Sequence, residues 1–254
     1  MIEVKNVDKS FDGNHVLKDV SATFETGITN MIIGQSGSGK TVLMKSIIGL
    51  HRIDHGEIKY DGRNLPDMHM SEIRILRKEV GMLFQGSALF DSLSVLENVM
   101  YPLEMFSSST KEEMTERARF CLSHVNLEEK AFHLAPSEIS GGMQKRVAIA
   151  RAIALQPKYL FCDEPNSGLD PKTSLIIDRL IYEITHEFNI TTIINSHDMN
   201  SVMEIGENII FINNGQKAWQ GNKNEIFHVN NQKLNDFVFA SNLYKKVRES
   251  NQQS

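Results

Sequence analysis

The stretch that decides the fold is Gly34-Gln35-Ser36-Gly37-Ser38-Gly39-Lys40-Thr41, which has the form G-x-x-x-x-G-K-[ST]. An apolar run at 28–33, the length of a buried parallel strand, comes directly before it, and residues 43, 47 and 50 then repeat apolar side chains at helical spacing. A glycine-rich loop in this position turns backbone N–H groups inward and adds the positive N-terminal end of a helix. We therefore expect the loop to bind the phosphates of a nucleoside triphosphate, with Lys40 at the β- and γ-phosphates and the Thr41 hydroxyl on Mg²⁺.

The composition is that of a soluble globular protein. The 254 residues, 41% hydrophobic and 23% charged, suffice for one large α/β domain or two smaller units. The net charge of −5 argues against a mainly electrostatic nucleic-acid binder and leaves a local basic patch open. Cys121 and Cys162 have no metal or redox spacing. No apolar run approaches the roughly 18 residues of a membrane span, and the strand-like start is not a secretory signal. We expect a cytoplasmic protein that reaches membranes only through a partner.

Polar residues follow three further apolar runs that predict strands: Gln85, Asp163-Glu164 and His197. In an open α/β sheet, ligands bind at the carboxyl ends of the strands. An Asp at such a strand end suits Mg²⁺, and a neighbouring carboxylate can orient water. We therefore expect Asp163 and Glu164 at the reaction centre. Gln85 is either a contact to Mg²⁺ or the attacking water, or a surface residue that opens a loop. A lone histidine is usually structural, but the position of His197 favours a function.

A second anion site is predicted at Ser140-Gly141-Gly142, which begins a predicted helix. A serine N-cap followed by two glycines exposes backbone N–H groups. A simple helix start explains the serine but not the glycines, which reduce helix stability. One chain that binds one nucleotide has no evident need for a second site.

The strand pattern changes to helices between residues 86 and 157. Capping boxes at Ser94-x-x-Glu97 and Thr110-x-x-Glu113 begin two helices, and regular strands return only at Tyr159. This predicts a helical insertion into the α/β core. A late hairpin turns at 213–215. The apolar residues of the extension 229–254 either pack back on the parent domain or dock onto another chain.

Phe11 comes just before a predicted turn at Asp12-Gly13. On local sequence alone it is equally well an aromatic that stacks on an adenine ring or a core residue beside a turn.

In this order, the motifs resemble those of the ATP-binding-cassette (ABC) ATPases. Gly34–Thr41, Gln85, Ser140–Gln144, Asp163-Glu164, Ser167–Asp170 and His197 are similar to the Walker A, Q-loop, signature, Walker B, D-loop and switch-histidine motifs. The resemblance covers residues 1–228, our predicted ATPase domain with its insertion at about 86–157. It implies an α/β P-loop NTPase fold of the ABC type, with a RecA-like core, an antiparallel β subdomain and a helical subdomain. Phe11 stands where Tyr is usual, and Ile139 and Met143 replace the common Leu and Gln of the signature.

The resemblance also implies the roles of the residues. Two chains pair head to tail, so that ATP with Mg²⁺ is held between Lys40 of one chain and Ser140 of the other. Glu164 polarises the attacking water, Lys40 neutralises charge, and His197 contacts the γ-phosphate. The metal ligands implied are Thr41, Gln85 and Asp163. The residues implied in nucleotide binding are Phe11, Gly34, Gln35, Ser36, Gly37, Ser38, Gly39, Lys40, Thr41, Ser140, Gly141, Gly142 and Asp170.

Within the family, the stretch Phe84–Val99 (FQGSALFDSLSVLENV) resembles the ATPases of phospholipid transporters that work with mammalian-cell-entry (MCE) proteins, above all the Mla system. This implies an integral-membrane permease, an MCE-type lipid-binding subunit and accessory proteins as partners, at the cytoplasmic face of the inner membrane, and no nucleic acid. The alternative is an ABC importer ATPase for an amino acid, a metal or another small solute. A soluble ABC ATPase without a permease is a third possibility, although the chain has neither two cassettes nor a long coiled coil.

Overall fold

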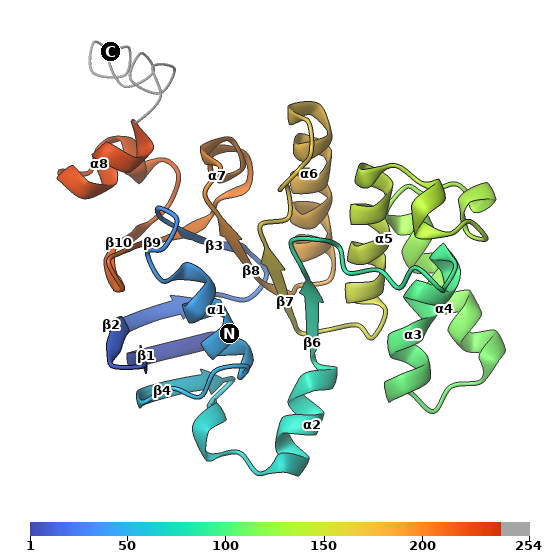
Figure 1. Ribbon diagram of the computed structural model, residues 1–254, viewed down its shortest axis with the longest axis horizontal. Coiled ribbons are helices and arrows are strands. Elements are labelled where there is room, and N and C mark those ends of the chain that lie inside the picture. The colour runs from blue at the N-terminus through green and yellow to red at the C-terminus, as the bar shows by residue number, and fades with distance from the viewer. Residues whose placement is uncertain (240–254) are drawn as a thin grey trace. The chain divides into compact units, whose positions relative to one another are not determined.

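The computed structural model describes residues 1–239 (Figure 1). The described chain divides into two compact units. The first unit contains residues 1–25, 29–68 and 195 onward, and the second contains 26–28 and 69–194. This division does not follow the predicted insertion at 86–157, and the domain limits 1–228 and 229–254 remain predictions.

The first unit contains an antiparallel sheet with the strand order β2-β1-β4-β5. Its members are β1 (Ile2–Phe11), β2 (Asn14–Phe24), β4 (His55–Tyr60) and β5 (Arg63–Asn64). Alternating apolar residues of β1 are buried, since Ile2 and Val4 are at most 1% exposed. Asp12 and Gly13 both have positive φ, as the tight turn of a two-residue hairpin requires. The predicted antiparallel region and its turn are confirmed.

The first unit also contains β3 (Thr29–Ile33), which pairs in parallel with β9 (Asn208–Asn213). The antiparallel hairpin from β9 to β10 (Gln216–Gly221) confirms the predicted turn. Two helices of this unit follow the nucleotide loop and the end of a strand, α1 (Lys40–Ile48) and α7 (Met199–Ile205). All five residues of β3 are buried, as expected for a central parallel strand.

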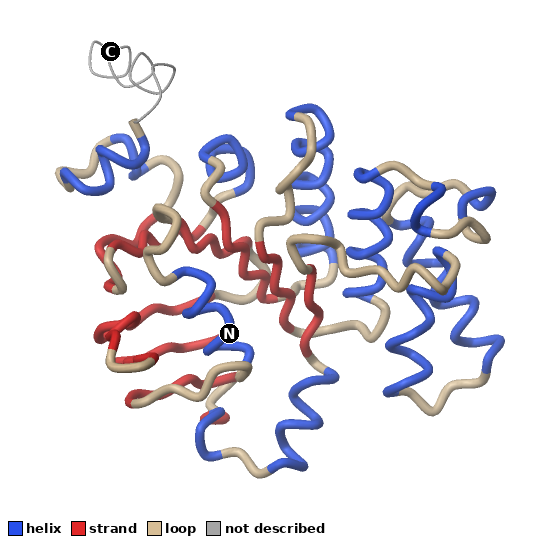
Figure 2. The backbone as a smooth tube through the Cα atoms, viewed as in Figure 1, coloured by secondary structure: helices blue, strands red, loops and turns tan. Residues whose placement is uncertain are grey.

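In the second unit, β6 (Val80–Leu83) pairs in parallel with β7 (Tyr159–Asp163), with Leu83 opposite Cys162. The strand β8 (Thr191–Ser196) begins in this unit, and its last two residues belong to the first unit. Figure 2 shows these strands in red. Because β6 and β7 run in parallel and in register, the residues that follow them leave the sheet at the same edge.

Helices make up the rest of the second unit. The predicted capping boxes begin α3 (Val95–Phe106) and α4 (Lys111–His124), and α5 (Gly141–Ile153) begins at the predicted serine N-cap. The long helix α6 (Pro171–Glu187) follows β7, with Asp170 as its N-cap. Short 3-10 turns occur at Leu65–Asp67, Glu129–Ala131, Pro136–Glu138 and Glu225–Phe227. Within the described range 84–158, no strand lies between β6 and β7, as predicted.

The helix α2 (Met70–Lys78) is not predicted from the sequence. Leu76 is its only buried residue, and Met70 and Ile75 are more than half exposed. The apolar residues Met70, Ile73 and Leu76 do recur at helical spacing, so the sequence carries a helical period here that our predictions did not include. Among residues 1–239, no helix is long and apolar enough to cross a membrane.

The start of the C-terminal extension packs on the first unit. In α8 (Gln232–Val238), Leu234 is fully buried and the Phe237 ring lies 5.5 Å from the ring of Phe211 on β9. The helix therefore follows the first of our two alternatives as far as residue 239. Leu243 and Tyr244, which we also considered, lie outside the described residues.

Replacing Leu234 by alanine is expected to destabilise the protein by about 2–5 kcal/mol, because it leaves a cavity under α8. Urea unfolding followed by circular dichroism measures the change. The matched control is Lys233→Ala, an exposed position on the same helix, which should change stability by less than about 0.5 kcal/mol. Equal stability of both variants would contradict the packing of α8.

Candidate nucleotide-binding and hydrolysis site

The glycine-rich loop joins β3 to α1, as predicted. The Lys40 amine folds back over it and donates to the backbone oxygens of Gly34 (2.8 Å) and Gln35 (3.0 Å). Lys40 is only 6% exposed, whereas Gln35, Ser36 and Gly37 are exposed at the tip of the loop. The Lys40 cation is therefore buried within the loop, and the residues at the tip of the loop are exposed.

Two details of the loop depend on its small residues. A side chain at Gly34, whose φ is +149°, would place a Cβ only 2.2 Å from the Ile212 carbonyl oxygen. The Ser38 hydroxyl is buried without a hydrogen-bond partner in the described part of the chain. A buried hydroxyl normally has a partner, so an orphaned one in a phosphate-binding loop is consistent with a ligand that completes it. The loop thus passes a structural test for phosphate binding.

The side chain of Thr41, the predicted Mg²⁺ ligand on this loop, has one neighbour that the sequence does not reveal. The Asn195 amide donates to the Thr41 hydroxyl at 3.2 Å. Asn195 is fully buried at the end of β8. It lies 154 positions from Thr41, and its only sequence signal is an amide that follows the apolar pair Ile193-Ile194. We read it as a residue that orients the hydroxyl.

Phe11 lies at the end of β1 and is 37% exposed, so it is not a core residue. Its ring meets the ring of His51 edge to face at 5.1 Å, and the Lys9 ammonium lies 5.0 Å from its centroid. Lys9 also pairs with Asp54, and that hydrogen bond lowers the pKa of the Asp54 carboxyl. An exposed ring with a flanking cation is able to stack on a base.

His197 follows β8 directly and is exposed.

In the second unit, the parallel pair of β6 and β7 brings Gln85 and Asp163 to one sheet edge. The Gln85 amide donates to the Ser167 hydroxyl at 3.1 Å. Asp163 ends β7, and Glu164 follows it with a φ of 47°, an uncommon conformation for a residue other than glycine. Strained backbone of this kind clusters at functional sites. These three predicted residues therefore meet at the carboxyl ends of their strands, as the sequence indicates.

Ser140, Gly141 and Gly142 also lie in the second unit, where they line an open pocket of about 370 Å³ together with Gly168, Leu169 and Asp170. The Ser140 hydroxyl caps α5 by accepting a hydrogen bond from the Met143 N–H. The Asp170 carboxylate caps α6 and accepts from the Thr173 N–H at 3.0 Å, and the hydrogen bonds from Thr173 lower its pKa. The N-terminus of α5 has a neutral cap and suits an anion, whereas the N-terminus of α6 is already occupied by the Asp170 carboxylate.

Gly142 has a packing reason as well. A Cβ at this position would lie 2.7 Å from the Thr173 methyl group of α6. The sequence attributes both glycines to anion binding, and the structure adds that one of them permits α5 to approach α6.

The predicted Mg²⁺ ligands are a hydroxyl (Thr41), an amide (Gln85) and one carboxylate (Asp163). Among residues 1–239, no group of three His, Cys, Asp or Glu side chains is placed to hold a metal ion. A sparse set of hard oxygen donors matches Mg²⁺, which keeps several waters and takes its other ligands from substrate phosphates. The donor chemistry therefore agrees with Mg²⁺ that arrives with a nucleotide.

Comparison with known proteins identifies the family. The family described as "ABC transporter" matches residues 17–167. The glutamine transport ATP-binding protein GlnQ of Escherichia coli is 38% identical over 239 residues, which cover 94% of this chain and 98% of GlnQ. The methionine import ATP-binding protein MetN of Clostridium tetani is 39% identical over 227 residues, which cover 89% of this chain and 71% of MetN.

Solved structures agree. The ATP-binding cassette MJ0796 in a dimeric post-hydrolysis state bound to ADP and Pi superposes with a TM-score of 0.78 and 33% identity, covering 87% of this chain and 98% of that one. CbiO1 of Clostridium perfringens, part of the transporter complex CbiONQ, has a TM-score of 0.84 and 27% identity and covers 99% of this chain and 98% of its own. The predicted fold class is confirmed.

The narrower prediction, a phospholipid transporter of the Mla type, is not supported by these relatives, since GlnQ and MetN are named for glutamine and methionine. The 16 residues of Phe84–Val99 are too short a stretch to outweigh similarity over nearly the whole chain. The glycine-rich loop, the acidic strand end and the family match together show that the chain belongs to the ABC transporter family, as an ATP-binding and ATP-hydrolysing subunit.

Proposed function

We propose that this chain is the ATPase subunit of an ABC importer for a small solute, with amino acids as the substrate class. The observation that carries this proposal is the match to GlnQ, which extends over 94% of this chain and 98% of that relative. A relative matched over its whole length is more informative about the role of the chain than one matched only in the shared motifs. The subunit would act at the cytoplasmic face of the membrane, bound to an integral-membrane permease.

The proposed chemistry follows from the site residues. Lys40 and the backbone N–H groups of Gly34–Thr41 hold the phosphates, and Phe11 stacks on the base. Thr41, Gln85 and Asp163 would hold Mg²⁺, which when bound would supply positive charge to the phosphate oxygens. Glu164 orients the water for in-line attack on the γ-phosphorus, and His197 contacts the γ-phosphate.

In the proposed assembly, two copies pair head to tail. This arrangement gives the pocket at Ser140–Gly142 its ligand, the γ-phosphate bound by the other copy, and gives Asp170 a place beside it. The dimeric state of the related cassette MJ0796 with ADP and Pi supports it.

A second candidate is the ATPase of a phospholipid transporter with an MCE-type subunit. Only the segment Phe84–Val99 favours it. The experiment that separates the two candidates is affinity purification of the tagged chain from detergent-solubilised membranes, followed by identification of the bound proteins. A permease with an amino-acid-binding protein supports the importer. An MCE-type lipid-binding subunit overturns it in favour of the lipid transporter, and recovery without a permease contradicts both.

The segment after Gln85 is our candidate surface for the permease. Phe90 is 41% exposed and lies against Tyr101 of α3, with ring centroids 4.5 Å apart. Tyr101, Met105 and Phe106 of the same helix are also exposed. Exposed apolar side chains that gather in this way mark interaction surfaces. Packing within the helical region accounts for Val95, Leu96 and Val99, which are buried, but it does not account for the exposed Phe90.

Charge substitutions at this surface are expected to uncouple the subunit. Phe90→Asp and Leu93→Asp should keep ATPase activity in the isolated chain and lose permease binding by at least about tenfold, as truncation of an interface anchor does. Co-purification and ATPase assays measure the two quantities. The matched control is Phe120→Asp, an exposed phenylalanine of α4 that should leave binding unchanged. Folded variants that bind the permease as strongly as the wild type would place the interface elsewhere.

A further inference from the structure

Two cations of α5 bind the backbone that carries Gln85. The Lys145 ammonium donates to the Gln85 carbonyl, and the Arg151 guanidinium donates to the carbonyls of Ser87 (2.6 Å) and Ala88 (2.7 Å). Lys145 is 4% exposed, and burial lowers the pKa of both side chains. Within residues 1–239, neither cation pairs with a carboxylate. Because a buried charge without a counter-ion is unfavourable, these three carbonyls are the compensation that keeps the cations in place.

The backbone they bind is in a strained conformation. Ser87 (φ 61°) and Ala88 (φ 49°) are consecutive non-glycine residues in the left-handed region, and Ser87 is only 4% exposed. Each such residue raises the free energy of the native state, so the conformation persists only where the surroundings fix it. The hydrogen bonds from Arg151 end on the carbonyls of these two residues. The Arg151 guanidinium therefore stabilises the same two residues whose backbone is strained.

The next turn of the chain is held separately. The fully buried Asn98 of α3 donates to the carbonyls of Phe90 (3.1 Å) and Leu93 (3.1 Å) and accepts from the Phe90 N–H (2.8 Å). The α5 cations therefore act on 85–88, and Asn98 acts on the residues that follow. The hydrogen bond from Lys145 fixes the backbone of Gln85, and the side-chain amide of Gln85 donates to the Ser167 hydroxyl.

We propose that Lys145 and Arg151 are positioning residues that fasten the segment Gln85–Ala88 to α5, so that Gln85 moves together with the helix that Ser140 begins. The group assigned to the metal of this chain's own nucleotide and the group assigned to the γ-phosphate bound by the other copy then belong to one rigid piece. This inference rests on the role given to Gln85 in the proposed function, and the experiment below distinguishes a failure of either.

The first measurement compares kcat for ATP with the affinity for a fluorescent ATP analogue in the full-length chain. Lys145→Met and Arg151→Met are each expected to lower kcat by about 10- to 100-fold, as misplacement of a reacting group by about an ångström does. Analogue affinity stays unchanged, because the loop Gly34–Thr41 is untouched. Arg151→Lys, which keeps a donor cation, recovers part of the lost kcat.

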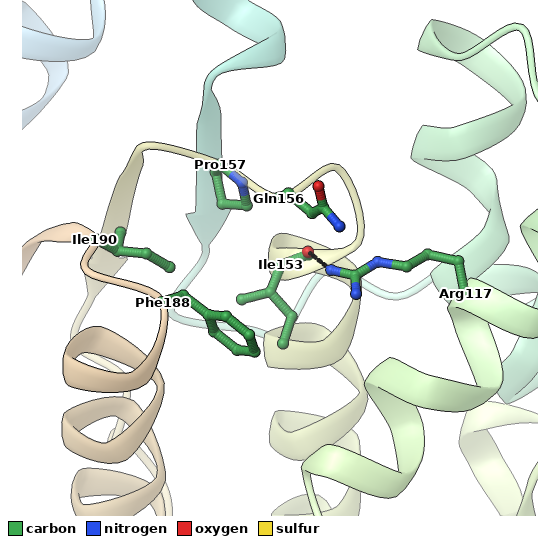
Figure 3. Close-up of a pocket in the computed structure, with 6 residues that line it drawn as sticks. All are labelled: Arg117, Ile153, Gln156, Pro157, Phe188 and Ile190. Carbon is green, nitrogen blue, oxygen red and sulfur yellow. Dashed lines mark hydrogen bonds between the residues drawn. The ribbon is translucent and has the colours of Figure 1, made fainter.

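The matched control is Arg117→Met. The Arg117 guanidinium also donates to two backbone oxygens at α5, those of Ile153 (2.9 Å) and Ala154 (3.0 Å), but at the far end of the helix from Ser140. Figure 3 shows this arginine beside Ile153, with Gln156 and Phe188 lining the same pocket. The variant is expected to lower the unfolding temperature and to leave kcat of the folded protein unchanged.

A double-mutant cycle tests whether Lys145 acts through Gln85. If it does, Lys145→Met combined with Gln85→Ala has the same kcat as Gln85→Ala alone, because the positioned group is already gone. Losses that multiply instead overturn the proposal. If Gln85→Ala alone leaves kcat at the wild-type value, the proposed role of Gln85 fails, and nothing remains for the cations to position.

Hydrogen exchange reports the fastening directly, without reference to hydrolysis. Amides in the segment 86–88 should exchange at least about tenfold faster in Lys145→Met and Arg151→Met than in the wild type or in Arg117→Met. Unchanged exchange overturns the proposal. Faster exchange with a wild-type kcat also overturns it. In that case the two cations hold the segment in the wild type, but this has no effect on the rate of hydrolysis. In both cases a low kcat of Gln85→Ala leaves the proposed function intact.

Discussion

Glu164→Gln is expected to leave ATP binding intact and to lower the rate of hydrolysis by ~10²–10⁴-fold, the usual contribution of a positioned general base. The amide keeps the size of the carboxylate but lacks the basicity that polarises water. The backbone at Glu164 has a φ of 47°, an uncommon conformation that sets the direction in which the side chain leaves the chain. Glutamine adopts that conformation at the same cost, so the protein should fold with unchanged stability.

Because ATP joins the two copies in the proposed assembly, this variant should accumulate as an ATP-bound dimer. Size-exclusion chromatography in the presence of ATP and Mg²⁺ measures the dimer, and phosphate release measures turnover. Glu183→Gln, an exposed position on α6, is the matched control and should behave as the wild type. A monomer under all conditions, for the chain and for its complex with the permease, would contradict the head-to-tail dimer.

Lys40→Ala is expected to lower ATPase activity by ~10²–10³-fold, the typical loss when one preorganised electrostatic contact to the transition state is removed. The Lys40 ammonium is held against the loop by two carbonyls and is only 6% exposed, so the substitution removes a charge that is fixed at the loop. Nucleotide affinity should fall as well, because the same charge contacts the bound phosphates.

Steady-state phosphate release and titration with a fluorescent ATP analogue measure both effects. Lys45→Ala is the control on the same helix, since Lys45 lies in the last turn of α1, away from the loop, and should retain activity. Thermal unfolding shows whether each variant folds. More than about a tenth of the wild-type activity in Lys40→Ala would be incompatible with the proposed role of this residue.

Much of the fold follows from local sequence patterns. The phosphate loop, the serine and threonine caps of α3, α4 and α5 and both hairpin turns appear where the sequence predicts them. Each depends on hydrogen bonds or φ values within a few neighbouring residues, so the sequence alone carries the information. The order of the motifs likewise identifies the family, which the comparisons confirm.

The substrate class, unlike the fold, does not follow from local sequence patterns. The segment Phe84–Val99 favours lipids, and similarity over the whole chain favours small solutes. An ATPase subunit in this family hydrolyses the same nucleotide whatever crosses the membrane, so its reaction residues carry no information about the cargo. The proposal of an amino-acid importer therefore rests on similarity to GlnQ over nearly the whole length of both sequences.

By itself, the sequence predicted that the chain binds ATP in a glycine-rich loop, and it determined which acidic and polar residues follow the neighbouring strands. Only the tertiary structure decided which side chains hold these groups in place: Asn195 on Thr41, and the α5 cations on the Gln85–Ala88 backbone. The partners are 60 to 154 positions apart along the chain. No local pattern encodes such contacts, because they form only when packing of the apolar strands and helices brings distant segments together.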